Sequence, residues 1–345
     1  FLTSCIEQTG DRLLLCLSRK DGRILWQKTV LTAPLERKHG ENSFASSTPA
    51  TDGKHLWVAF LQKEDMIVAC YDLSGNEVWR KSPGKLLSRH GFCSSPILWK
   101  NLVILNGDQD AQAYLVALEK ETGKEVWRAD RPNRTRSYCA PLIVEAAGKT
   151  QMVLSGSKCV TSYDPATGKL HWILDGPTEQ YVASLVHTRG IFFLTTGFPE
   201  YHLMGIRDTA EGNITGTRAI AWHHRKLKEL QASYVPSPVA VGDYFYVVSD
   251  KGLLSCFHAE TGKLEWSQKL GRRHRSSLVA VDGHLLVSSD EGDTWVVKAG
   301  PRYELVAKNR LDEGSYASHA VSHGDLLIRT FGHVYCLSVN SKAKK

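Results

Sequence analysis

One short phrase that ends in tryptophan returns along the whole chain. Clear copies read DGRILW, DLSGNEVW, ETGKEVW, ATGKLHW and ETGKLEW, and a worn copy reads GTRAIAW. The tryptophans follow one another at intervals of 53, 48, 45, 50 and 44 residues: Trp26, Trp79, Trp127, Trp172, Trp222 and Trp266. A self-similar period in the forties is typical of a repeat fold, and it overrides the length-based expectation of two domains.

Each copy predicts a β-hairpin. An apolar strand, such as 67–72 or 159–164, runs into a polar turn that carries glycine, and a second strand with the tryptophan follows. Glycine suits such a turn because the backbone there needs positive φ. The indole supplies a large apolar surface for the contact between repeats.

Upstream of each hairpin lies a second recurring segment, which predicts two further strands per copy. Four meandering strands with a period in the forties are typical of a β-propeller blade. We therefore expect an all-β fold, an eight-bladed β-propeller of four-stranded antiparallel blades, in one domain over 1–345. The expected blades are 1–30, 44–80, 92–128, 138–173, 181–223, 234–267, 274–307 and 316–340.

The first and last of these blades are incomplete. The first lacks its innermost strand and the last lacks its fourth, as expected if a segment before Phe1 were missing and had supplied the closing strand. Seven blades, with the two ends merged into one, is the alternative.

Four of the eight cysteines occupy one repeated position in the third strand, where other copies have Ala117 or Ser162. We interpret this position as a slot for a small buried side chain. Equivalent positions in different blades should lie too far apart for a disulfide. Cys93 and Cys139 are the one pair expected to be close, and whether they form a disulfide stays open.

Charge and hydropathy exclude some classes of protein. The net charge is +7, but Lys and Arg are scattered rather than gathered in a stripe, so we expect no nucleic-acid binding. No apolar run is long enough for a membrane span. We expect a monomer.

The strand, acidic turn, TGK and tryptophan pattern resembles the repeat of the PQQ-like, quinoprotein-type β-propellers over essentially the whole chain. The divergent copies are similar to uncharacterised extracytoplasmic bacterial members, which implies a periplasmic or secreted protein. Quinoprotein dehydrogenases of this family bind pyrroloquinoline quinone and calcium beside a vicinal Cys–Cys pair. This chain has no such pair and no CxxCH haem motif, so we expect neither the quinone nor calcium as a cofactor.

In a propeller, the loops that lead into the innermost strand share one face with the loops between the second and third strands. A structural residue recurs from blade to blade, whereas a site uses each blade differently. Eight residues meet that criterion: His90, Asp108, Asp110, Arg136, Glu179, Glu200, His202 and His274. The entry loops add Asn42 and an aromatic position that recurs in most copies, which supplies the tyrosines. From these residues, the candidate catalytic residues are His90, Arg136, Glu179, His202, Tyr234 and His274. The candidate ligand-binding residues are Asn42, Asp108, Asp110, Tyr138, Tyr181, Glu200 and Tyr316. No spacing predicts a metal site.

Two classes of function fit these residues, and whether the chain is an enzyme stays open. The first is a binding propeller that holds a polar ligand, a carbohydrate, or a protein partner in a central funnel, without quinone chemistry. The second is a carbohydrate-active enzyme. A lyase would use Arg136 to neutralise a uronate while His90, Tyr234 or His274 takes the C5 proton. A hydrolase would pair Glu179 with Glu200 or Asp108.

Overall fold

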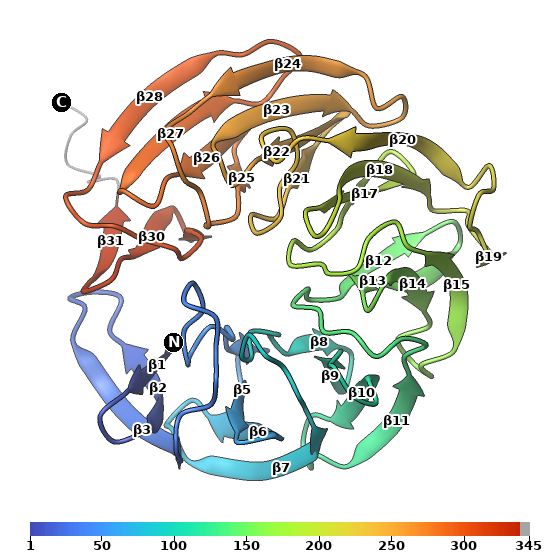
Figure 1. Cartoon of the computed structure of the whole chain (residues 1–345). Helices are drawn as coiled ribbons and strands as arrows, with labels where there is room; N and C mark the ends of the chain where they lie inside the picture. Colours follow the sequence, from blue (N-terminus) through green and yellow to red (C-terminus); the bar gives the residue numbers. More distant parts are fainter. Residues whose placement is uncertain (339–345) are drawn as a thin grey trace. The chain divides into compact units, whose positions relative to one another are not determined.

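The computed structural model describes residues 1–338, which form β-strands and no helix. The chain divides into two compact units, unit 1 with Phe1–Gln180 and unit 2 beginning at Tyr181. Each unit contains four antiparallel sheets whose strands follow one another in chain order. Figure 1 labels these strands.

Unit 1 supplies three strands to its first sheet and four strands to each of its other three sheets. Their strands are β1 (Leu2–Ile6), β2 (Asp11–Leu17) and β3 (Ile24–Thr32); β4 (Ala50–Thr51), β5 (His55–Gln62), β6 (Asp65–Asp72) and β7 (Glu77–Lys85); β8 (Ile97–Trp99), β9 (Leu102–Gly107), β10 (Tyr114–Glu119) and β11 (Glu125–Asp130); β12 (Leu142–Ala146), β13 (Lys149–Gly156), β14 (Cys159–Tyr163) and β15 (Leu170–Asp175).

Unit 2 has three four-stranded sheets and ends in a three-stranded one. Their strands are β16 (Val186–Thr188), β17 (Ile191–Thr196), β18 (Tyr201–Arg207) and β20 (Ile220–Leu227), with the short β19 (Gly212–Asn213) between the last two; β21 (Val239–Val241), β22 (Tyr244–Val248), β23 (Leu253–His258) and β24 (Leu264–Lys269); β25 (Val279–Val281), β26 (His284–Ser288), β27 (Asp293–Lys298) and β28 (Leu305–Arg310); β29 (Ala320–Ser322), β30 (Asp325–Arg329) and β31 (Val334–Ser338).

The eight sheets confirm the predicted fold class, all-β with eight propeller blades. Among residues 1–338, the first sheet, β1–β3, has no innermost strand and the last, β29–β31, has no fourth strand, as expected. Because these two form separate sheets, the seven-blade alternative is wrong. The expectation of one domain stays a prediction.

The repeated tryptophan joins neighbouring blades, and it does so in the same way in both units. Its indole N–H donates to a backbone carbonyl in the next hairpin turn: Trp26 to Leu73, Trp79 to Lys120, Trp127 to Pro165, Trp222 to Ala259 and Trp266 to Gly300, at 2.8–3.0 Å. The rings of Trp26, Trp79, Trp127 and Trp222 lie against the glycine of that turn, whereas the Cβ position of Gly300, opposite Trp266, is open. A Cβ at Gly123 would come within 2.6 Å of the Trp79 ring, and one at Gly168 within 2.6 Å of Trp127.

The small-residue slot lies directly across the sheet from this tryptophan. The cross-strand pairs are Cys16 with Trp26, Cys70 with Trp79, Ala117 with Trp127, Ser162 with Trp172, Gly205 with Trp222 and Cys256 with Trp266. Directly opposed residues in an antiparallel pair have neighbouring Cβ atoms. A small side chain therefore leaves room for the indole, which explains why cysteine recurs there without forming disulfides.

All eight cysteines are free, including Cys93 and Cys139. Loss of solvation raises the pKa of both of these thiols to about 12, so they remain protonated at neutral pH. The Sγ of Cys93 faces the carbonyl of Tyr138 at 3.8 Å. The two residues are packing residues without a disulfide between them.

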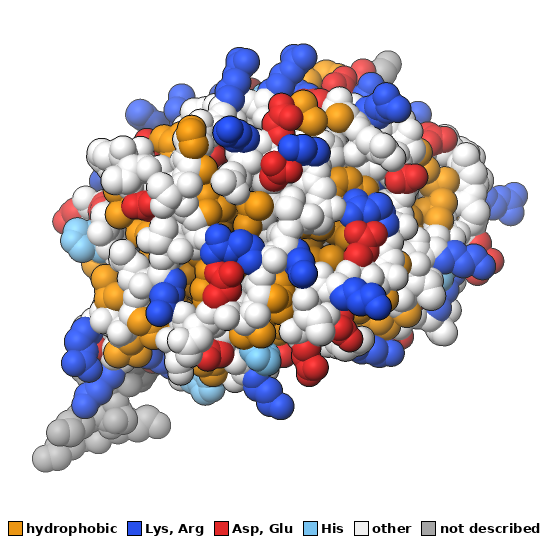
Figure 2. Space-filling view, turned by 90° about the horizontal axis from the view of Figure 1, so that it is seen from below, with side chains coloured by type: hydrophobic (Ala, Val, Ile, Leu, Met, Phe, Trp, Pro, Cys, Tyr) orange, Lys and Arg blue, Asp and Glu red, His pale blue; other side chains and the backbone are white. Residues whose placement is uncertain are grey.

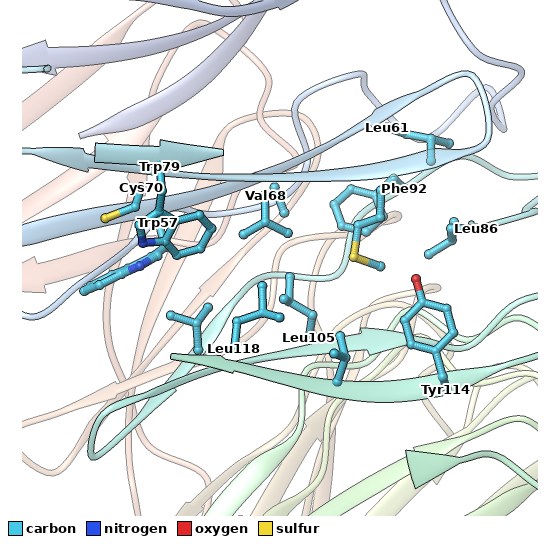
Figure 3. Close-up of a cluster of buried hydrophobic side chains, with 14 residues drawn as sticks. Trp57, Leu61, Val68, Cys70, Trp79, Leu86, Phe92, Leu105, Tyr114 and Leu118 are labelled. Atoms are coloured by element: carbon cyan, nitrogen blue, oxygen red, sulfur yellow. The ribbon is translucent and has the colours of Figure 1, made fainter. Parts of the chain in front are cut away.

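The core of unit 1 lies between successive sheets. Figure 3 shows one such cluster, in which Trp57 and Trp79 pack with apolar side chains of β6, β9 and β10. Both indoles donate to the same carbonyl, that of Lys120, at 3.3 and 2.8 Å. Unit 2 has cores of the same kind, for example around Phe193 and Phe245, whose rings stack at 4.6 Å.

The surface carries charges of both signs. On the face shown in Figure 2, Lys and Arg side chains are interspersed with Asp and Glu. Among residues 1–338, no helix has the length and apolar character needed to cross a membrane.

The contact between glycine and indole predicts the effect of Gly123→Ala. The substitution places a methyl group in the left-handed region and against the Trp79 ring, so it should cost about 2–4 kcal/mol of the free energy of unfolding. Gly148→Ala is the matched control, because Gly148 has φ +73 against +68 for Gly123 but open space around its Cβ position. It should lose only about 1–2 kcal/mol. Urea unfolding followed by fluorescence measures both, and equal losses would contradict the docking role of Gly123.

Candidate functional site

Five of the predicted residues come together in unit 1. Asn42 precedes β4, His90 lies between β7 and β8, Asp110 between β9 and β10, and Arg136 and Tyr138 between β11 and β12. Loops of three successive blades therefore contribute to one group of polar side chains, here called the His90 cluster.

Direct contacts form two groups within the His90 cluster, and the charges of Arg136 and Asp110 act on His90. The Tyr138 hydroxyl and His90 Nδ1 form a hydrogen bond of 2.9 Å, and Asn42 Nδ2 donates to the His90 carbonyl at 2.8 Å. Arg136 pairs with Asp110 at 2.6 Å, with 13% and 26% of the two side chains exposed. The guanidinium is thus oriented by a carboxylate and still reaches solvent.

The electrostatics of the cluster favour a neutral imidazole in positive surroundings. Burial, and then the positive charge of Arg136, hold the pKa of His90 below its ordinary value, and His39 and Arg89 act in the same direction while Asp110 opposes them. The His39 ring lies 5.4 Å from that of His90. A group surrounded by more cations than anions attracts an anionic ligand.

Asp108 forms the buried floor beneath this cluster. It pairs with Arg131 at 2.8 Å, with both side chains wholly inaccessible, and accepts a hydrogen bond from Ser137 at 2.6 Å. Burial alone would lower the pKa of Arg131, but the Asp108 carboxylate keeps it high. The adjoining cavity, lined by Asp108, Ser137 and Tyr138 among others, has a volume of about 10 Å³. That volume holds about one water molecule, so Asp108 is in place to order the Ser137 loop rather than to touch a ligand.

Glu179 lies in unit 1 outside the His90 cluster. Its backbone carbonyl accepts a hydrogen bond from the N–H of Lys158, in the β13–β14 turn, at 3.3 Å. Within residues 1–338, no hydrogen bond or ion pair joins its side chain to His90 or Arg136.

In unit 2, His202 belongs to a directional chain of polar contacts. Arg225 Nε donates to His223 Nδ1 at 3.0 Å, so the His223 proton resides on Nε2 and points at His202 Nδ1, 3.1 Å away. His202 Nε2 then faces Glu200 at 3.3 Å. Burial lowers the pKa of His202 and lowers that of His223 to about 4, which keeps both rings neutral at pH 7.

The other predicted residues of unit 2 are held by packing or by their backbone. Both ring nitrogens of the wholly buried His274 lie 2.8 Å from carbonyl oxygens, those of Ser288 and Leu270. Tyr181 is wholly buried as well. The backbone N–H of Tyr234 donates to Asp250 at 2.7 Å.

Tyr316 is different, because 41% of it is exposed. Its ring packs edge-on against Phe331 at 4.9 Å, and the Arg275 guanidinium lies 4.4 Å from its centre. The Tyr316 ring is therefore an accessible aromatic surface. Its contacts do not include the residues of the His202 chain.

Sequence reasoning missed three residues that organise these groups. Arg131 is one of three arginines in RPNRTR, and nothing in that run distinguishes this buried arginine from the other two. His39 lies in the irregular stretch before β4 and His223 in the basic run HHRKLK, and neither segment sets its histidine apart in the sequence. For His223, the available signal was its place next to Trp222, in a strand that pairs with the strand of His202.

A larger hollow in unit 2, of about 540 Å³, contains none of the predicted residues. Arg189, Arg207, Asp208 and Glu260 are among its lining residues, and Arg189 and Asp208 are engaged by Asp243 and His187 at 2.5 and 3.0 Å. Across the described chain, no group of three or more His, Cys, Asp or Glu side chains could hold a metal ion.

Known proteins resemble the chain over different lengths. A quinohemoprotein alcohol dehydrogenase, ADH IIB of Pseudomonas putida, is 31% identical over 120 residues, which is 31% of this chain and only 17% of the relative. Among solved structures, BamB from Moraxella catarrhalis has a TM-score of 0.65 at 12% identity, covering 97% of this chain and 94% of its own. The computationally designed Ika8 protein has a TM-score of 0.67 at 13% identity, covering 98% and 92%.

The quinohemoprotein alcohol dehydrogenase of Comamonas testosteroni has a TM-score of 0.61 at 10% identity, covering 94% of this chain and 69% of its own. Likeness at such low identity shows the shared fold alone. The family described as outer membrane protein assembly factor BamB matches residues 10–190 and 211–300. With most of its length matched, and with the tryptophan-docked blades described above, the chain belongs to this family of PQQ-like β-propellers.

Proposed function

We propose that this protein is a binding propeller that holds a polar, carboxylate-bearing ligand on the His90 cluster, without quinone redox chemistry. The observation that carries the proposal is the convergence of Asn42, His90, Asp110, Arg136 and Tyr138 from loops of three blades. A uronic acid in a carbohydrate is the ligand that best fits this cluster. A periplasmic or secreted location belongs to the same proposal and is supported by the family description, which names the outer membrane.

The chemistry of each group supports an acidic sugar. Arg136 offers a guanidinium fork for a carboxylate, and charge-assisted hydrogen bonds of this kind are the strong ones. Asn42, His90 and Tyr138 add neutral donors and acceptors suited to hydroxyl groups. Absence of a vicinal cysteine pair in the sequence is the reason to leave pyrroloquinoline quinone and calcium out of the proposal.

Loss of the guanidinium should weaken binding. Arg136→Gln should raise the Kd for an oligouronate by about 10- to 100-fold, because one charge-assisted interaction is worth roughly 1.5–3 kcal/mol. Titration calorimetry with acidic and neutral oligosaccharides measures this. Arg80→Gln is the matched control, since Arg80 pairs with Glu77 on β7, away from the cluster. Equal affinity of wild type and Arg136→Gln would refute this site, and binding of acidic peptides in place of sugars would show that the ligand is a protein.

Affinity for an anionic ligand should depend on pH through His90. Its pKa in the folded protein is lowered, so the ring is neutral at pH 7 and gains its charge only as pH falls through that lowered value. A carboxylate ligand stays ionised in this range. We expect affinity to rise between pH 7 and pH 5 in wild type and to stay flat in His90→Gln. The same slope in both proteins would exclude His90 as the source.

A lyase is the second candidate, because His90 and Tyr138 form a hydrogen-bonded pair beside a guanidinium. Neutral His90 would take the C5 proton of a uronate while Arg136 stabilises its carboxylate, the electron pair would form the C4=C5 double bond, and Tyr138 would donate its proton to the leaving C4 oxygen. The hydrolase alternative is not carried forward. Asp108 is occupied by Arg131, and Glu200 is 70% exposed beside His202.

Ultraviolet absorbance of unsaturated products distinguishes lyase from binder. A lyase should lose about 100-fold or more of its rate in Tyr138→Phe. The oligouronate affinity should fall by only about 2- to 10-fold, because a single neutral hydrogen bond is lost. If no unsaturated product forms from polyuronates of different linkage, the lyase is excluded and binding remains as the proposed function. Turnover with added quinone, calcium and a dye acceptor would overturn the exclusion of redox chemistry.

A further inference from the structure

The loop between β17 and β18 in unit 2 departs from the loops at the same place in the next two blades. All three loops have four residues, between β17 and β18, between β22 and β23, and between β26 and β27. The second residue of the later loops is Asp250 or Asp290, and each carboxylate is engaged within the fold, by backbone N–H groups or by an arginine. Phe198 takes this position in the first loop, and 46% of it is exposed. An exposed phenyl ring thus replaces a residue that serves the blade itself.

Tyr234, in the loop before β21, supplies a second aromatic ring beside Phe198. The two ring centres lie 6.4 Å apart, with an angle of 36° between the ring planes. A Cβ at Gly197 would come within 2.2 Å of the Tyr234 Cβ, so the glycine lets the two loops approach each other closely. Aromatic rings at such a separation attract each other. The rings of Phe198 and Tyr234 therefore form one aromatic surface, here called the Phe198 platform.

Hydrogen bonds hold both loops of the Phe198 platform in place. The Tyr234 N–H donates to the Asp250 carboxylate at 2.7 Å, and the Tyr234 carbonyl accepts a backbone N–H at 3.2 Å. In the other loop, Thr196 Oγ1 donates to the Glu200 carbonyl at 3.0 Å and closes the turn that carries Phe198. A rigid aromatic surface loses little conformational entropy when a ligand stacks on it. The platform is therefore preorganised for binding.

Glu200 adds a carboxylate to the same loop, two positions after Phe198, and 70% of its side chain is exposed. The carboxylate lies 3.3 Å from His202 Nε2, whose proton is directed toward it because Arg225 and His223 fix the tautomers of both rings. His202 is neutral at pH 7, so it leaves the negative charge of Glu200 in place. The loop of the platform therefore offers an accessible hydrogen-bond acceptor whose charge disfavours acidic ligands.

We propose that the Phe198 platform binds a neutral sugar ring, which stacks on Phe198 and Tyr234 and donates hydroxyl hydrogen bonds to Glu200. A pyranose ring presents C–H groups on its faces and hydroxyl groups around its rim. This distribution matches an apolar aromatic surface accompanied by a carboxylate, which only accepts hydrogen bonds. The expected preference for neutral over acidic sugars is the reverse of the one proposed for the His90 cluster, and the two proposals are independent.

Titration calorimetry of the full chain with neutral oligosaccharides, derived from glucan, mannan, xylan and chitin, tests the proposal. We expect saturable binding of at least one of them. Phe198→Ala should raise its Kd by about tenfold or more, because one stacked ring is lost, whereas Phe198→Tyr keeps the ring and should bind like wild type. Leu305→Ala is the matched control, since 47% of Leu305 is exposed, on β28, and it should leave the Kd unchanged.

Saturation-transfer NMR provides the second measurement, on the unsubstituted protein. Irradiation of aromatic protons should transfer to the C–H protons of the bound sugar, and this transfer should weaken in Phe198→Ala. Three results would each overturn the proposal: no binding of any neutral oligosaccharide at millimolar concentration, equal affinity of wild type and Phe198→Ala, or binding of apolar peptides in place of sugars. Phe198→Ala should lower the affinity for neutral sugars alone and Arg136→Gln the affinity for uronates alone, so the two proposed sites succeed or fail separately.

Discussion

The contact between an indole and a glycine turn is the interaction on which the rest of the structure depends. One tryptophan meets two local requirements, because its ring covers the turn glycine of the next blade and its N–H satisfies a carbonyl there, as Trp79 does with Gly123 and Lys120. Burying an aromatic ring while pairing its polar group avoids the cost of an unsatisfied donor. Within each unit, these contacts join one blade to the next, and contacts between neighbouring repeats are how repeat proteins propagate order. Trp172, the last tryptophan of unit 1, instead donates to Gln151 of its own blade.

This docking also explains where the chain is free to vary. The strands carry the packing, so the loops at their ends can differ from blade to blade without loss of the fold. Three such loops bring Asn42, His90 and Arg136 together. Beneath them, Arg131 and Asp108 form an ion pair that is fully buried and hydrogen-bonded, and this pair orders the loop that carries Tyr138. A buried pair of this kind is retained for geometry, since its desolvation offsets much of its attraction.

Departure from the repeat was a useful but incomplete guide to the candidate site. It singled out His90, Asp110 and Arg136, and the structure pairs Arg136 with Asp110 and His90 with Tyr138, a residue of the recurring aromatic position. It also singled out His274 and Asp108, whose unusual identity serves buried contacts. A polar residue that differs between blades can face a ligand or fill a unique internal gap, and burial alone separates these cases.

The sequence by itself determined the number of blades, the hairpin turns and the position of each small slot, because these follow from a period and from the size limits of glycine and cysteine beside an indole. Only the tertiary structure decided which arginine of RPNRTR is buried, which histidines meet across β18 and β20, and which loops touch. Those outcomes depend on contacts between residues tens of positions apart, where loop conformation rather than periodicity sets the distance. The repeating sequence pattern therefore predicts the interactions that recur in each blade. The interactions that occur only once depend on loop conformation, which only the tertiary structure shows.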